Sequence, residues 1–225
     1  MGARTIEPTL DVQGDLDPMN RILQPYAFAA GGSGPSFLID EDFEGTGTPS
    51  GWGTTGSGTA NFDSTTSPLE GAQSLRLTGT TNIISTTLTI QEPELWWKFR
   101  YKPASLPSVT LRIPLIYDSA FNEIAKIILH TTGQLIVDGG GIFELTTDSL
   151  SAGTEYWITG HYKKGSGANA VLECGFSTTD TRPSSGSKYA GATNGTQTAN
   201  TDLVLLGSGN IVADFDVVQI ATTTF

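Results

Sequence analysis

Apolar and polar residues alternate along most of the chain after residue 36. In segment 94–102 every second side chain is apolar, and the residues between are mostly charged; the apolar set is Leu95, Trp97, Phe99 and Tyr101. Such alternation is typical of a strand with one buried face. The same period recurs at residues 108–118, 154–164 and 168–176, and further strand candidates lie at 73–78, 83–90, 122–131, 134–138, 142–146, 202–207 and 213–221.

Turn-forming residues separate these segments, and no window has a helical period. The chain of 225 residues contains 27 Gly, and its ten Phe, six Tyr and four Trp are enough for a substantial core. Many short strands joined by Gly, Ser and Thr turns favour two packed antiparallel sheets. The sequence therefore predicts an all-β sandwich over residues 37–225.

Residues 1–36 differ from the rest, because they contain four prolines and no sustained period. They are predicted to form an extended N-terminal arm and linker. A flexible terminus is the alternative. A purely solvated tail would carry fewer apolar groups, so we favour an arm that anchors the domain to a partner through Ile6, Leu10, Leu16, Ile22, Leu23, Tyr26 and Phe28.

Charge and cysteine content exclude several classes of function. The formal charge is −11 and no basic patch is present, so nucleic-acid binding is not expected. The longest apolar runs are too short to span a bilayer, and the N-terminus does not resemble a secretory signal. A single cysteine, Cys174, is expected to be a buried small hydrophobe. Synthesis in a reducing cytoplasm is expected.

Several stretches together resemble a known fold family. "DEDFEGTGTPSGW", "SPLEGAQSLRLTG", "TTGQLIVDG", "AGTEYWITGHYKK" and "LLGSGNIVADFDVVQIA" are similar to the concanavalin A-like lectin/glucanase (LamG-like) jelly roll, in the versions found in tailed-phage and prophage virion structural proteins. The resemblance covers residues 37–225. It implies a two-sheet antiparallel jelly-roll sandwich whose first and last strands pair, Phe37–Glu44 beside Ala213–Ala221.

An acidic cluster opens the domain. Asp40, Asp42 and Glu44 have the Glu-x-Asp-x-Glu spacing of sandwich glucanases, whose retaining mechanism needs two carboxyls ~5–5.5 Å apart. The first residue is Asp, Glu41 replaces a core side chain, and the motif lies on the first strand, so a catalytic set is not expected. The simplest interpretation is an acidic, solvated strand edge. The alternative is a structural calcium site, formed across the first and last strands by Asp42, Glu44, Asp214 and Asp216.

The polar face of segment 94–102 is a candidate contact surface. Trp96, Lys98, Arg100 and Lys102 share it, and an outward Trp beside cations suits a sugar ring or a protein partner. A Trp covered by a loop is the alternative. His130 and His161 occur singly, without the spacing of a zinc site, and His161 is expected at the surface.

These observations predict a non-enzymatic virion structural protein. The expected role is a capsid decoration or cement protein, or a head- or tail-attached fibre module, anchored by the arm to the major capsid protein or to tail and head components. The protein is expected to form a homo-oligomer and to assemble into the virion in the host cytoplasm. The alternative from another class is a lectin-like module that binds a cell-surface glycan; a degenerate glucanase is a third.

Overall fold

A computed structural model describes residues 37–79, 82–85, 92–193, 195–197, 199–200, 203–207 and 210–225. The arm and its anchoring residues Ile6, Leu10, Leu16, Ile22, Leu23, Tyr26 and Phe28 lie outside the described residues. Within the described residues the chain is almost entirely β-structure, with one 3-10 turn at Gly167–Asn169. No helix of the described part is long and apolar enough to cross a membrane.

The larger sheet has eight strands, in the order β14-β13-β11-β6-β17-β4-β3, and β1 also pairs with β17. Every described pairing in it is antiparallel. Its strands are β1 (Phe37–Glu41), β3 (Thr59–Ser64), β4 (Ser74–Thr78), β6 (Glu94–Pro103), β11 (Tyr156–Lys163), β13 (Val171–Ser177), β14 (Tyr189–Ala192) and β17 (Ala213–Ala221).

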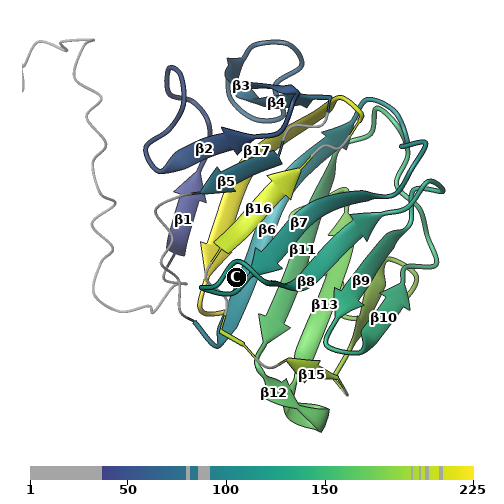
Figure 1. Cartoon of the computed structure of the whole chain (residues 1–225). Helices are drawn as coiled ribbons and strands as arrows, with labels where there is room; N and C mark the ends of the chain where they lie inside the picture. The colour runs from purple at the N-terminus through teal and green to yellow at the C-terminus, as the bar shows by residue number, and fades with distance from the viewer. Residues whose placement is uncertain are drawn as a thin grey trace, which may run out of the picture. The chain divides into compact units, whose positions relative to one another are not determined.

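The second sheet has seven strands, in the order β10-β9-β8-β7-β16-β5-β2. In Figure 1 its strands lie in front of those of the eight-stranded sheet. Its members are β2 (Trp52–Thr55), β5 (Asn82–Ser85), β7 (Leu111–Tyr117), β8 (Glu123–Leu129), β9 (Leu135–Gly139), β10 (Ile142–Leu145) and β16 (Leu203–Gly207). A two-stranded ribbon joins β12 (Gly165–Ser166) to β15 (Thr196–Gln197). The predicted antiparallel sandwich is confirmed.

The core lies between the two sheets and follows the alternation of the sequence. On β6, buried and half-exposed residues alternate along the whole strand, and the inward side chains Leu95, Trp97, Phe99 and Tyr101 are at most 1% exposed. Burying a side chain of this size contributes about 1.5–3 kcal/mol. The Tyr101 and Phe215 rings meet at 5.0 Å, which joins β6 to β17. Cys174 is buried in the same cluster, as predicted.

The first and last described strands are neighbours. Phe37 pairs with Ala221 and Asp40 with Gln219, so β1 lies along the second half of β17. The first half of β17 pairs with β4, and its other edge pairs with β6. The predicted contact between the two ends of the domain is therefore confirmed, and β17 lies inside the sheet.

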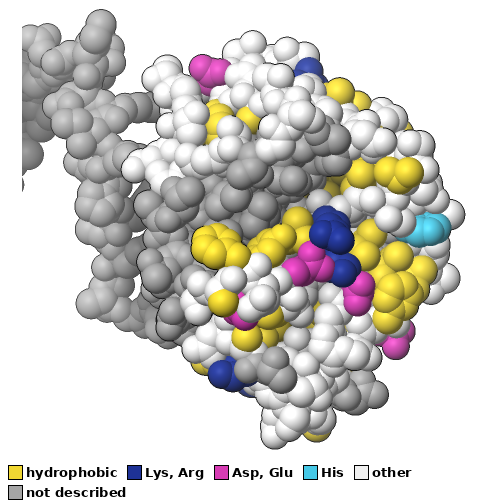
Figure 2. All heavy atoms as spheres, viewed as in Figure 1, with side chains coloured by type: hydrophobic (Ala, Val, Ile, Leu, Met, Phe, Trp, Pro, Cys, Tyr) yellow, Lys and Arg dark blue, Asp and Glu magenta, His cyan; other side chains and the backbone are white. Residues whose placement is uncertain are grey.

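The outer face of the seven-stranded sheet is apolar around a small group of charges (Figure 2). Lys126 pairs with Glu123 and Asp138, and Glu123 also pairs with Arg112. Phe143 and Leu145 on β10 are 59% and 41% exposed. The eight-stranded sheet has a hollow on its own outer face, lined by residues of that sheet and of the segments that follow β13 and β17.

Candidate functional site

The outer face of the eight-stranded sheet carries the polar side chains of β6. Trp96, Lys98, Arg100 and Lys102 share this face, because alternate residues of a strand point the same way. Neighbouring β11 extends the set, with Trp157 opposite Arg100, Thr159 opposite Lys98 and His161 opposite Trp96. Sequence spacing alone predicted that the four β6 residues share a face; their partners on β11 come from the register.

A hollow of about 200 Å³ opens on this face. Its walls are Lys98, Thr159, Asp180, Arg182 and Phe225. Lys98 Nζ lies 3.1 Å from both carboxylate oxygens of Asp180 and 5.1 Å from the ring centroids of Trp157 and Phe225. The hollow thus combines an exposed aromatic edge with hydrogen-bond donors and acceptors.

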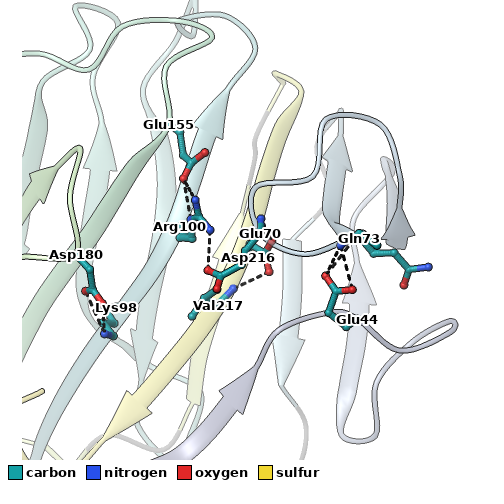
Figure 3. Close-up of polar contacts among 10 residues, drawn as sticks. Glu44, Glu70, Gln73, Lys98, Arg100, Glu155, Asp180, Asp216 and Val217 are labelled. Atoms are coloured by element: carbon teal, nitrogen blue, oxygen red, sulfur yellow. Dashed lines mark hydrogen bonds and ion pairs between the residues drawn. The ribbon is translucent and has the colours of Figure 1, made fainter. Parts of the chain in front are cut away.

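Arg100 lies beside the hollow and joins three parts of the chain (Figure 3). Its Nη1 lies 2.7 Å from Glu70 Oε2, and its Nε lies 2.7 Å from Glu155 Oε1. Its guanidinium carbon is 5.6 Å from the Trp157 ring centroid. Arg100 therefore fixes the loop before β4 and the segment before β11 to the polar face. Farther along, Lys102 Nζ donates to Ser67 Oγ at 2.8 Å.

Trp96 is not a free platform for a sugar ring. Its ring is stacked on His161, with centroids 3.5 Å apart and planes 8° apart. The Arg182 guanidinium carbon lies 4.4 Å from the same indole ring. Both contacts use the ring faces of Trp96, so the structure agrees with the alternative of a Trp covered by a loop.

His161 is buried, which corrects the expectation that it lies at the surface. Its residue is 6% exposed, and its Nε2 lies 2.8 Å from Glu94 Oε1. Burial lowers the pKa of His161 to about 4, although the hydrogen bond to Glu94 opposes this. We assign the proton of the neutral ring to Nε2, because Glu94 at 2.8 Å is nearer than Glu173 at 3.2 Å and a carboxylate can only accept.

Glu173 lies on the other side of His161 and is held by Tyr189 of β14 and by Arg182 of the loop between β13 and β14. The Tyr189 hydroxyl donates to one of its oxygens and Arg182 contacts the other. His161 Nδ1 is 3.2 Å from that second oxygen. Glu173 therefore holds Arg182 at the wall of the hollow. The His161 imidazole lies against the Trp96 ring, away from solvent.

The four predicted calcium ligands do not form one site. Asp214 pairs with Arg76 at 2.7 and 2.9 Å, whereas the other three carboxylates accept backbone N–H groups. The N–H of Glu44 donates to Asp42. The N–H groups of Ala72 and Gln73 donate to Glu44, and those of Glu70 and Val217 donate to Asp216 (Figure 3). In the part of the chain that is described, no group of three or more His, Cys, Asp or Glu residues is placed to hold a metal ion.

The same geometry removes the glucanase alternative for the opening acids. Strand β1 ends at Glu41, and Phe43 adopts a positive φ of 54°, so Asp42 and Glu44 no longer alternate with Asp40 on one face. Asp40 Oδ1 accepts a hydrogen bond from the Gln219 side chain. The Phe43 ring turns into the core and is 1% exposed.

Asp216 stands out among these carboxylates because it is fully buried. Its residue is 0% exposed. Burial raises the pKa of Asp216 to about 7, with a smaller contribution from the negative charge of Glu44. The N–H groups of Glu70 and Val217 and the charge of Arg100 oppose this rise. Asp216 is therefore a half-ionised group under the loop before β4, near neutral pH.

Comparisons with known proteins show the fold and no closer kinship. No protein-family model matches the chain, and no curated protein sequence matches it. Among solved structures, the endo-β-1,4-glucuronan lyase of the fungus Trichoderma reesei is 13% identical, with a TM-score of 0.62 over 84% of this chain and 96% of the lyase.

Two further structures illustrate the range of proteins with this fold. The alginate lyase of Aplysia kurodai is 7% identical, with a TM-score of 0.58 over 84% of this chain and all of the lyase. The lumenal domain of VIP36, in a form with bound Ca²⁺ and Man2, is 13% identical, with a TM-score of 0.53 over 82% of this chain and 87% of that domain.

These comparisons correct one prediction and leave another without support. The prediction of a non-enzymatic protein is wrong, because sandwiches similar to this one include two lyases. A phage origin is not shown by these three structures. One neighbour binds Ca²⁺, so a structural calcium is compatible with this fold. The four ligands predicted in this chain are nevertheless dispersed. The described domain is an antiparallel jelly-roll β-sandwich.

Proposed function

We propose that the protein recognises a polysaccharide on the outer face of its eight-stranded sheet. The hollow between Lys98, Thr159, Asp180, Arg182 and Phe225 is the observation that carries this proposal. Carbohydrate sites combine an apolar surface for the ring with a few polar groups that orient the hydroxyls. Phe225, 37% exposed, supplies the first, and the paired charges of Lys98 and Asp180 supply the second.

The neighbours support the proposal in a general way. Their names connect this fold with a glucuronan lyase, an alginate lyase and a domain with bound Ca²⁺ and Man2. Fold alone does not assign an activity, so the proposal depends on the hollow and its side chains. Because two of the neighbours are lyases, each polysaccharide that binds is also assayed for cleavage, which is detected as an unsaturated product.

Binding is tested with two variants of the hollow and two matched controls. Lys98→Ala and Phe225→Ala are expected to weaken binding to an immobilised polysaccharide about tenfold, because each removes a wall of the hollow. Lys126→Ala and Phe143→Ala change a paired lysine and an exposed phenylalanine on the other sheet, and they should bind as the wild type does. Equal losses in all four variants would contradict the proposed site.

Placement in a phage particle, assembly in a host cytoplasm and homo-oligomerisation stay predictions from the sequence. Attachment to a particle is tested by removing the arm. Removing residues 1–36 is expected to leave a cooperative thermal transition, since the strand pattern begins at Phe37, and to abolish attachment to particles. A truncated protein that still decorates particles would contradict the anchoring role.

A further inference from the structure

We infer that the ligand of the hollow is an uncharged polysaccharide; this inference rests on the proposed function and names its substrate class. It follows from the way the charges of the face are paired. Glucuronan and alginate, the polymers named for the two lyase neighbours, carry a carboxylate on each sugar unit. A face that binds such a chain needs cations that are free to meet those carboxylates.

The cations around the hollow already have carboxylate partners in the protein. Lys98 pairs with Asp180, Arg100 with Glu70 and Glu155, and Arg182 with Glu173. Farther out, Arg76 pairs with Asp214 and Lys163 with Glu94, whereas Lys102 donates to the Ser67 hydroxyl instead of a carboxylate. An acidic chain laid along the face would meet a fixed negative charge beside each of the paired cations, and like charges brought together at an interface are unfavourable. The formal charge of −11 adds a long-range repulsion.

Paired ions suit the hydroxyl groups of a neutral sugar. A hydroxyl both donates and accepts, so it can donate to Asp180 and accept from Lys98 without breaking the pair. The hollow therefore presents alternating donors and acceptors with no unbalanced positive charge. Thr159, in its wall, is only 2% exposed as a residue and donates its hydroxyl to the Gly175 carbonyl at 3.4 Å.

The segment around Asp180 adds further hydroxyls. Ser177, Thr179 and Thr181 form a triangle of hydroxyl contacts of 3.0–3.1 Å. These residues are exposed or half-exposed, and Asp180 lies between the two threonines in the sequence. Hydroxyls of this kind exchange hydrogen bonds with the hydroxyls of a neutral sugar at little electrostatic cost.

The test compares neutral and acidic polysaccharides on the full chain. Laminarin, mannan and xyloglucan are the neutral probes; alginate and glucuronan are the acidic ones. At least one neutral probe is expected to bind at least about tenfold more tightly than either acidic probe, with a Kd that changes little with salt, because no ion pair with the ligand forms. Tighter binding of an acidic probe, weakening as salt rises, would overturn the inference and leave the proposed function standing.

A charge variant sharpens the comparison. Asp180→Asn keeps the shape of the side chain and frees Lys98, so alginate binding is expected to rise about two- to fivefold. Asp138→Asn, which removes one of the two carboxylate partners of Lys126 on the other sheet, is the control and should change nothing. If Asp180→Asn leaves alginate binding unchanged, the pairing does not set the specificity and the inference fails. Binding of none of the five probes would instead reject the proposed function, and the inference with it.

Discussion

Gly160 marks the closest approach between β11 and an aromatic ring of the core. A Cβ at this position would lie 2.1 Å from Trp97 Cζ2, and Trp97 is 1% exposed and cannot move aside. Gly160→Ala is therefore expected to lower the free energy of unfolding by about 1–3 kcal/mol, measured by denaturant titration. Gly45→Ala, where nothing lies within 4 Å, is the control. Equal midpoints for the two variants would show that the sheet can relax around the ring.

Single residues also show what the sequence could not predict about the site. Alternation placed Lys98 and Arg100 on one outer face, and the structure places them there. Asp180, Arg182 and Phe225 come from a loop and from the end of the chain, where no period exists, so their convergence on Lys98 depends on tertiary structure. The burial of His161 has the same origin: its own strand puts it outward, and Trp96 and Arg182 then cover it.

At the scale of elements, the loop before β4 depends on two carboxylates. Glu44 accepts from the N–H groups of Ala72 and Gln73, and Asp216 accepts from that of Glu70. Position 71 requires glycine, because its φ is +58° and a Cβ added there would lie 2.1 Å from Glu44 Oε1. The loop is thus attached both to the segment after β1 and to β17.

Glu44→Gln is expected to loosen this loop without unfolding the sandwich. The amide removes the negative charge that strengthens the hydrogen bonds, so the Ala72 and Gln73 amide hydrogens should exchange several times faster. Asp42→Asn is the control, because Asp42 accepts from the Glu44 N–H, whereas the Ala72 and Gln73 N–H groups donate to Glu44. Unchanged exchange in Glu44→Gln would mean that the loop is held by its other contacts.

Three strands that the sequence pattern did not predict are similar in composition. β2 reads WGTT, β3 TANFDS and β14 YAGA, so small and polar residues leave little alternation to detect. β2, β3 and β14 end their sheets, where fewer neighbours require burial. The long strands β6, β11 and β17 could be predicted because each is buried on one face along most of its length.

At the scale of the whole molecule, two buried groups give opposite pH dependences. The pKa of Asp216 is raised to about 7 from 3.8 by burial, so its contribution to stability is largest at low pH and is lost as the pH rises toward 7. The pKa of His161 is lowered to about 4 from 6.5, again by burial. Its contribution is present above pH 6.5 and is lost as the pH falls toward 4. In the wild type the two effects oppose each other.

Removing one of the two groups should leave the pH dependence of stability that the other produces. Asp216→Asn is expected to lose stability, relative to wild type, as the pH falls from about 7 to about 4, by at most about 3 kcal/mol. His161→Gln should lose stability as the pH rises over the same range. Urea midpoints measured across that range provide the test. Two variants with parallel profiles would show that these groups do not control the pH dependence.

The position of β17 has a consequence for synthesis. This strand is made after every other described strand, yet it lies between β6 on one side and β4 and β1 on the other. While the chain is being translated, β4 and β6 therefore have no strand between them, and the aromatic side chains of β6 have no Phe215 to pack against. Folding of the larger sheet must wait until β17 has left the ribosome. Until then the edges of β4 and β6 that face β17 stay unpaired, and unpaired strand edges are prone to aggregation.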